Sequence, residues 1–203
     1  MGSSIPMQLF QPISRFDNFA AMLTIRFATI NDAELIADIS RQTFYETFAP
    51  LNGKENMDQF MNDQFTREVL INEVGEADNI FLLAFDDKNP VGYVRLREKN
   101  APTELNNIDV IEIARIYVTA NDVGKGVGKA LMQECIKIAI EKGKEYIWLG
   151  VWQENHRAIN FYEKWGFEKF TTHLFMLGDD PQTDWLMKKS ISGLSIHNFS
   201  IQK

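Results

Sequence analysis

The 203-residue sequence is poor in the residue types that bind metals or form cross-links. With a single cysteine, Cys135, it forms no intramolecular disulfide, and the place of Cys135 on the apolar face of a predicted helix indicates a core residue. The three histidines, His156, His173 and His197, are scattered, unlike the ligands of a metal site. We therefore expect no metal and no cysteine nucleophile.

Long apolar runs and an excess of positive charge are missing too. No segment is long and apolar enough to cross a bilayer, which argues against a membrane protein. Lys and Arg total 21 against 28 Asp and Glu, and the resulting charge of −7 disfavours a nucleic-acid surface and permits a cationic substrate. We expect a small-molecule partner, no nucleic acid and no membrane; the sequence leaves a homodimer open.

The length fits one well-filled domain. We place an N-terminal extension at residues 1–21, the domain at 22–190 and a C-terminal tail at 191–203. Because Met1–Pro6 lacks a charged region followed by a long apolar stretch, we expect no secretory signal and a cytoplasmic protein.

Hydrophobic periodicity and turn residues predict the first elements of the domain. A strand is expected at Leu23–Phe27, and a helix from Asn31 to beyond Phe44. A second helix should run from Glu55 to about Val74, and 79–85 and 91–97 should form a hairpin.

Glycines gather in the run Val123–Lys129, between an apolar strand-like segment, 110–118, and a helix-like segment that ends at Gly143. At a strand-to-helix turn, unpaired backbone N–H groups and the positive end of the helix dipole favour an anion. A Walker loop needs glycine at Val123 and a hydroxyl at Ala130, and the dinucleotide fingerprint fails as well. An anion cradle and a simple tight turn both remain open.

Downstream residues give this run a context. Tyr146–Trp152 reads as a buried strand, and the short helix that follows ends at Gly166. The glycine run, this strand and the spacing of Asn155, Ala158, Phe161–Tyr162 and Gly166–Phe167 together resemble the coenzyme-binding half of the GCN5-related N-acetyltransferases. The resemblance extends from about residue 23 to residue 189.

This resemblance implies a mixed α/β (α+β) fold in one domain. Its central, mostly antiparallel twisted sheet should be splayed at the middle strands and flanked by helices. The cosubstrate would be acetyl-coenzyme A, without a metal. Three runs, Thr43–Phe48, Trp148–Trp152 and His173–Asp184, are similar to the PaiA-type spermine/spermidine acetyltransferases, which implies a polyamine acceptor.

The resemblance also implies the coenzyme-binding residues. Backbone groups of Ile116, Tyr117 and Val118 would pair with the pantetheine arm, and a bulge near Tyr117 or Val118 would splay the strand and direct an N–H at the thioester carbonyl. The pyrophosphate would be held by Gly124, Lys125, Gly126, Val127, Gly128 and Lys129. Asn155 would contact the pantetheine or thioester region, and Lys164 the ribose phosphate. Since the family usually has Gln or Arg where this chain has Val123, we expect weaker coenzyme binding rather than none.

Acetyl transfer to an alkylamine needs a base that removes a proton from the ammonium. Glu112 is the first candidate, because it lies in an otherwise apolar strand, where burial tunes carboxylates for proton transfer. The alternative is a salt-bridged glutamate, and Glu46 is the reserve. The resemblance assigns the general acid toward the coenzyme sulfur to Tyr162, against the alternative of a packing residue.

Acceptor-binding candidates are Tyr45, Glu46 and His173. The acidic residues Asp179, Asp180 and Asp184 either attract a cationic amine or belong to an ordinary turn, which we favour. The aromatic residues Phe44, Tyr45 and Phe48 either line the acceptor site through cation–π contact or belong to the core of an amphipathic helix; we favour core for Phe44 and Phe48 and leave Tyr45 open. Two other functions stay open: acetylation of a protein N-terminus or another small amine, and a non-catalytic acyl-coenzyme A sensor.

Overall fold

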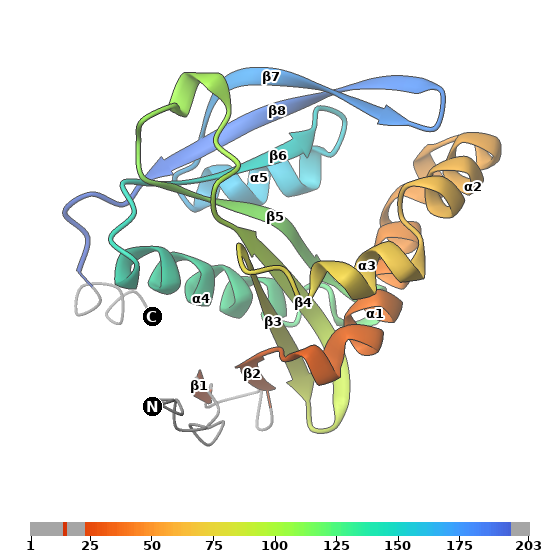
Figure 1. Ribbon diagram of the computed structural model, residues 1–203, viewed down its shortest axis with the longest axis horizontal. Helices are drawn as coiled ribbons and strands as arrows, with labels where there is room; N and C mark the ends of the chain where they lie inside the picture. The colour runs from red at the N-terminus through yellow and green to blue at the C-terminus, as the bar shows by residue number, and fades with distance from the viewer. Residues whose placement is uncertain (1–13, 16–22, 196–203) are drawn as a thin grey trace, which may run out of the picture.

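An eight-stranded sheet runs through the molecule in a computed structural model that describes residues 14–15 and 23–195 (Figure 1). Its order is β1-β2-β3-β4-β5-β6-β8-β7, and only the β5–β6 pair is parallel. The strands are β1 Ser14–Arg15, β2 Leu23–Phe27, β3 Asn79–Asp86, β4 Asn89–Arg97, β5 Val110–Val118, β6 Tyr146–Trp152, β7 Glu168–Leu177 and β8 Asp180–Ser190. The predicted mostly antiparallel sheet is confirmed.

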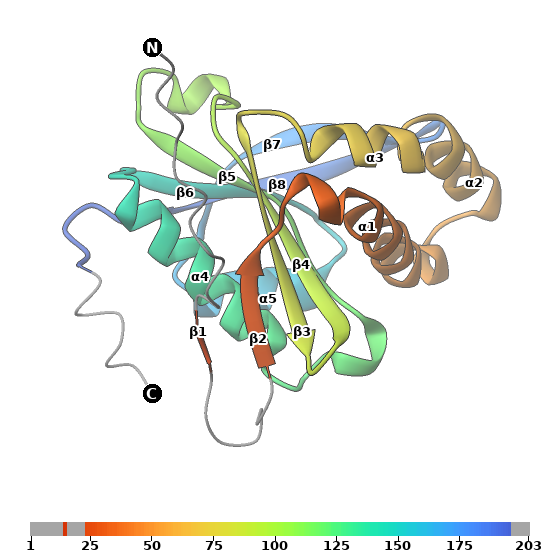
Figure 2. The same cartoon turned by 60° about the horizontal axis from the view of Figure 1, so that its bottom comes forward.

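The α-helices cover both faces of this sheet (Figure 2). They are α1 Ala33–Phe48, α2 Lys54–Asp63, α3 Arg67–Glu73, α4 Val127–Glu141 and α5 His156–Lys164. The helices α4 and α5 pack on one face, and α1, α2 and α3 pack on the other. Across residues 23–195, no helix is long and apolar enough to cross a membrane.

The single helix predicted at 55–74 is wrong, because two helices fill this stretch. The helix α2 ends at Asp63, and Thr66 then begins α3 as its N-cap, where its side chain accepts a hydrogen bond from the N–H of Val69. Threonine is a strong N-cap residue, and its extended backbone interrupts the helix. The break lets α2 and α3 take different directions over the sheet (Figure 1).

Alternation along β5 distributes its side chains between the two faces. Ile111 and Ile113 join the core under α4, where Cys135 is fully buried as predicted. A β-bulge then shifts the register, because Arg95 pairs with Arg115 whereas Leu96 pairs with Ile113, leaving one extra residue on β5. After the bulge, the alternation is inverted.

The position of this bulge corrects the expectation from sequence. The extra residue is Ala114, several positions before Tyr117, and the bulge lies in the ladder with β4 rather than on the side of β6. Without it, Tyr117 would share the face of Ile113. With it, Tyr117 contacts the cores on the α1–α3 face, which is also the face of Glu112.

The sheet is splayed between β5 and β6, as predicted. The two strands pair only from Val110–Tyr146 to Glu112–Trp148. Beyond that point β5 pairs with β4 alone and β6 with β8 alone, so the facing edges of both strands have no ladder partner. We call this opening the splay; its apex is at Glu112.

Two features of the described residues concern the proposed domain limits. The strand β1 lies within the expected extension 1–21 and pairs with β2, while the rest of that extension is outside the described residues. Ile191, assigned to the C-terminal tail, is 3 % exposed and joins the main core. The tail beyond residue 195 is again outside the described part of the chain.

Candidate active site

The glycine run forms a turn from which backbone N–H groups project. Gly124 and Gly126 have φ values of +87° and +88°, a region that L-residues with side chains avoid, and a Cβ at either would meet only open space. In the described part of the chain, these two amides and those of Val127, Gly128 and Lys129 form no hydrogen bond. Five free donors at the start of α4 suit an anion such as a pyrophosphate.

Close packing holds this turn against the splay. A Cβ on Gly92 of β4 would lie 2.8 Å from the carbonyl oxygen of Tyr117 and 3.1 Å from Leu131, so glycine lets α4 approach the sheet. The side chain of Lys125 is paired with Asp122 at 3.0 Å, whereas Lys129 is exposed. The backbone N–H of Lys125 also donates to the carbonyl oxygen of Asp122, at 3.2 Å, so Asp122 binds both the side chain and the amide of Lys125.

Glu46, the reserve base and acceptor candidate, is used to hold the same region. One carboxylate oxygen accepts a hydrogen bond from the N–H of Ala120 at 3.1 Å, and the other accepts one from Gln42. Ala120 begins the short 3-10 helix that leads into the glycine turn. Glu46 thus ties α1 to the turn, and this contact has no signal in the local sequence.

Tyr162 is buried among apolar residues beside α4. Its ring packs against Phe161 and Phe167, with centroids 5.5 and 5.9 Å away. Burial raises the pKa of its phenol well above the ordinary value, so the group is a neutral O–H donor at physiological pH. The residue therefore packs in the core and also retains a proton that it can donate.

The other coenzyme candidates lie on α5 or at its start. The side-chain oxygen of Asn155 accepts a hydrogen bond from the N–H of Ala158 at 3.2 Å and so caps the helix, which leaves its NH₂ group for a ligand. Lys164 is the last residue of α5 and is exposed. On β5, Ile116, Tyr117 and Val118 present to the splay the unpaired backbone edge that was expected.

Glu112 is buried, as expected, and its carboxylate is fully bound. The Nε and Nη2 atoms of Arg97 lie 2.7 and 3.1 Å from its two oxygens, and Asn100 donates a further hydrogen bond at 3.0 Å. This is the salt-bridged arrangement that the sequence left as the alternative. As a base, Glu112 would have to leave a bidentate ion pair.

A second carboxylate, Asp184 of β8, lies farther along the open part of the splay. In the sheet it stands opposite Trp152 of β6 and His173 of β7. Its Oδ2 atom is 3.6 Å from where a Cβ on Gly150 would lie. Its side chain therefore extends over the part of β6 that does not pair with β5. No side chain among the described residues forms a hydrogen bond or ion pair with it.

Burial raises the pKa of the Asp184 carboxyl to about 6, an effect opposed by nearby His173. Phe48 of α1 joins the aromatic rings of Tyr117 and Trp152, with centroids 6.4 and 6.3 Å from its own. We call these five residues, Phe48, Tyr117, Trp152, His173 and Asp184, the Asp184 cluster. It lies on the α1–α3 side of the sheet.

The remaining acceptor candidates have simpler surroundings. Phe44 is buried in the core as predicted, and Tyr45 is 44 % exposed on α1. Asp179 lies in the turn between β7 and β8, and Asp180 begins β8 and accepts a hydrogen bond from Gln182. These two belong to the expected turn, whereas Asp184 does not.

Contacts that hold the β7–β8 hairpin over α2 were missed by sequence reasoning. Gln182 is buried and donates to Asn52, which follows α1, at 2.6 Å. At the tip of the hairpin, a Cβ on Gly178 would lie 2.9 Å from the backbone of Asn56, so the hairpin and α2 lie against each other (Figure 1). Each contact joins residues more than a hundred positions apart, so no local pattern reveals it.

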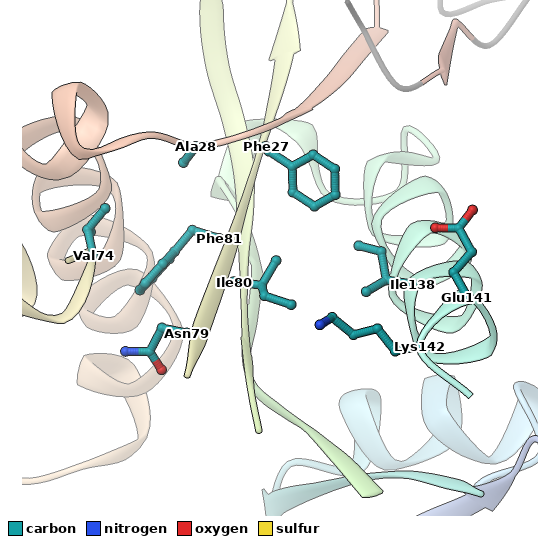
Figure 3. A pocket seen from close by; sticks show the side chains of 9 residues that line it. All are labelled: Phe27, Ala28, Val74, Asn79, Ile80, Phe81, Ile138, Glu141 and Lys142. Carbon is teal, nitrogen blue, oxygen red and sulfur yellow. The ribbon is translucent and has the colours of Figure 1, made fainter. Parts of the chain in front are cut away.

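A hollow of about 310 Å³ lies elsewhere among the described residues. Figure 3 shows it between Phe27, Ile80 and Ile138, at the C-terminal end of α4, with Lys142 pointing across it. Since α4 starts at the glycine turn and has 15 residues, the hollow is about 20 Å from that turn. None of the expected site residues lines it.

Comparison with known proteins agrees with this geometry. Residues 36–167 match the model of the acetyltransferase (GNAT) family. An uncharacterised N-acetyltransferase of Lactobacillus delbrueckii subsp. lactis is 38 % identical over 162 residues, which cover 78 % of this chain and 91 % of that protein. A spermidine N(1)-acetyltransferase of Thermoplasma acidophilum is 27 % identical, covering 82 % of this chain and 96 % of that protein.

Among solved structures, the PaiA N-acetyltransferase of Thermoplasma acidophilum in complex with coenzyme A is similar to this fold. Its TM-score is 0.66 at 26 % identity, covering 83 % of this chain and 98 % of that one. A probable acetyltransferase of Staphylococcus epidermidis has a TM-score of 0.67 at 19 % identity, a likeness of fold alone.

Proposed function

Because this chain belongs to the acetyltransferase (GNAT) family, we propose that it transfers the acetyl group of acetyl-coenzyme A to a primary amine of a polyamine such as spermidine or spermine. The chain is an N-acetyltransferase, and acetyl-coenzyme A is the cosubstrate of its family. The polyamine acceptor and the residue roles below are the proposal.

One observation carries the proposal: the splay separates two chemically different groups of residues. On the side of α4, the turn at Gly124–Lys129 presents five free amides. On the α1–α3 side, the Asp184 cluster offers a carboxylate and aromatic rings, which suit an ammonium through charge and cation–π attraction. A thioester held in the splay would meet an amine that arrives from the opposite face.

The residues present fit the coenzyme. The free amides and the open space at Gly124 and Gly126 suit a diphosphate, and the unpaired edge of β5 suits an extended amide-containing arm. When bound, the coenzyme supplies an activated acetyl thioester. Tyr162 keeps the proton that a departing thiolate needs, because its buried phenol does not ionise at physiological pH.

Support for a polyamine comes from the relatives that are named for spermidine or PaiA activity and from the charge of the Asp184 cluster. The proposed reaction is direct attack of the amine within a ternary complex; the one cysteine, Cys135, is buried, and burial raises the pKa of its thiol, which does not favour an acyl-cysteine intermediate. A cytoplasmic location and a homodimer stay predictions.

The test is an acceptor panel. Purified protein is incubated with acetyl-coenzyme A and spermidine, spermine, lysine or a peptide with a free N-terminus; thiol release and product mass are followed. We expect release with spermidine or spermine and a mass gain of one acetyl group. Release with the peptide alone would replace the polyamine by a protein acceptor, and coenzyme binding without release would indicate a sensor.

A further inference from the structure

We propose that the Asp184 carboxylate is the base that takes the proton from the acceptor ammonium. This inference rests on the proposed amine acceptor and assigns a catalytic role that sequence reasoning gave first to Glu112. Two carboxylates lie on the α1–α3 face of the splayed strands β5, β6 and β8. Their surroundings decide between them.

The carboxylate of Asp184 is available to a ligand, whereas that of Glu112 is not. Both carboxylate oxygens of Glu112 accept hydrogen bonds, which Arg97 and Asn100 donate at 2.7 to 3.1 Å. Asp184 forms no hydrogen bond or ion pair with any described side chain, so a ligand ammonium can approach it without displacing a partner. A half-buried carboxylate without a partner is costly, and binding a cation offsets that cost.

Asp184 also has the more open position in the splay. Glu112 marks the apex, where β5 and β6 are still paired, whereas Asp184 stands opposite Trp152, at the far end of the open half of β6. Asp184 lies on the α1–α3 face of the sheet, whereas Tyr162 packs in the core on the α4 face, so the proposed base and the proposed acid lie on opposite sides of the splayed strands. An acetyl group carried in the splay would thus lie between proton acceptor and proton donor.

The electrostatic surroundings of Asp184 also suit a general base. The titratable groups that face Asp184 are His173 on β7 and Tyr117 on β5, while β6 presents only Gly150 and Trp152. Burial places the pKa of Asp184 at about 6, close to the working pH. A general base is most effective there, because it is ionised and still binds a proton well.

The proton and bond changes balance. The ammonium R–NH₃⁺ gives one proton to Asp184, and the freed lone pair forms the N–C bond to the thioester carbonyl carbon. The C–S bond then breaks, the sulfur takes the proton of Tyr162, and the resulting phenolate recovers a proton from the acylated nitrogen. Asp184 releases its proton to water, so each turnover yields one amide, one thiol and one proton.

Asp184→Asn tests the assignment, with Asp179→Asn as the matched control. The control removes the same charge from the hairpin turn, where Asp179 is exposed. We expect Asp184→Asn to lower kcat with spermidine by about 10²- to 10⁴-fold and Asp179→Asn to leave it nearly unchanged. Equal losses in both variants would show that the hairpin only attracts a cation at long range and would overturn the proposal.

The pH profile distinguishes a catalytic role from a structural one, because loss of a merely structural residue would leave the shape of the profile unchanged. Wild-type kcat/KM should fall on the acidic side with an apparent pKa of about 6. In Asp184→Asn the inflection near pH 6 should vanish, and the rate should instead rise about tenfold per pH unit on both sides of pH 6, because only free amine reacts. An O-alkyl hydroxylamine, neutral at pH 7, should restore much of the rate of the variant.

Three results would contradict the role of Asp184: a raised KM with unchanged kcat, persistence of the inflection near pH 6 in Asp184→Asn, or an equal loss with the neutral acceptor. Each can occur while wild type acetylates spermidine, so the inference would fail and the proposed function would stand. Wild type that acetylates no amine would overturn both.

Discussion

The proposed coenzyme side and the proposed acceptor side of the splay are built in opposite ways. The turn at Gly124–Lys129 is one continuous segment, and the groups that it offers are backbone amides set by two glycines of positive φ. The Asp184 cluster takes side chains from five separate elements. The first arrangement tolerates side-chain changes, whereas the second can change its ligand with one substitution.

The carboxylates of Glu112 and Asp184 differ in a similar way. Glu112 holds Arg97 and stabilises the loop that carries Asn100. Asp184 has no such partner among the described residues and raises the energy of the folded state when ionised. Stability and reactivity are thus assigned to different carboxylates on one face of the sheet.

The largest expected effect is on the coenzyme side. Tyr162→Phe removes the proposed acid without changing the packing, so kcat should fall about 10²- to 10⁴-fold, or roughly 3–5 kcal/mol of barrier. Acetyl-coenzyme A affinity, measured by calorimetry, should stay within about twofold. An unaltered rate would show that Tyr162 is only a packing residue.

The next effect concerns the ion pair at the apex. Glu112→Gln leaves the half-buried Arg97 without a charge partner, which should lower the free energy of unfolding by about 1–3 kcal/mol. The control, Glu98→Gln, affects an ion pair with Lys142 and Lys144 nearer the surface and should cost less. Urea unfolding measures both. Equal losses of unfolding free energy would mean that the ion pair at the apex contributes no more to stability than the pair nearer the surface.

Asp184→Asn should instead stabilise the protein at pH 7. The pKa of Asp184 in the folded state, about 6, lies above its ordinary 3.8, so ionisation costs folding free energy above pH 6 and nothing below pH 4. We expect a gain of about 1–2 kcal/mol at pH 7 that disappears by pH 4. Unfolding at the two pH values checks this, and a loss at pH 7 would mean that Asp184 has a stabilising partner.

A smaller effect on coenzyme affinity is expected from a substitution in the glycine turn, but not from one beyond the other end of α4. Gly126→Ala forces a side chain into φ +88°, at a cost of about 1 kcal/mol, and should weaken coenzyme binding about tenfold. Gly143→Ala, at φ +68° beyond the other end of α4, should cost similar stability without changing affinity. If both variants bind the coenzyme like wild type, the turn is not the anion site.

These contrasts also explain what the sequence could predict. The strand Val110–Val118, the glycine turn and α4 follow from local patterns, because β-branched runs and glycine act on neighbouring residues. The break at Thr66 has a local signal, an N-cap, which the helical period concealed. The bulge at Ala114 has none, since the ladder with β4 determines it.

Long-range pairs limited the prediction of the site. For Glu112, the base and the salt-bridged glutamate both stayed open, because Arg97 and Asn100 are twelve or more positions away and nothing in the sequence pairs them with it. Asp184 was grouped with Asp179 and Asp180 because all three are close in sequence. Only the pairing of β8 with β6, which places Asp184 opposite Trp152, shows that Asp184 lies outside the turn that holds Asp179 and Asp180.

The most direct measurement compares kcat of Asp184→Asn and Glu112→Gln with spermidine at pH 7, per folded molecule. The account predicts that Asp184→Asn is folded and slow, with kcat reduced at least about 10²-fold, and that Glu112→Gln is less stable but turns over within a few-fold of wild type. The reverse order, with Glu112→Gln slow and Asp184→Asn unaffected, would contradict it and return the base to Glu112.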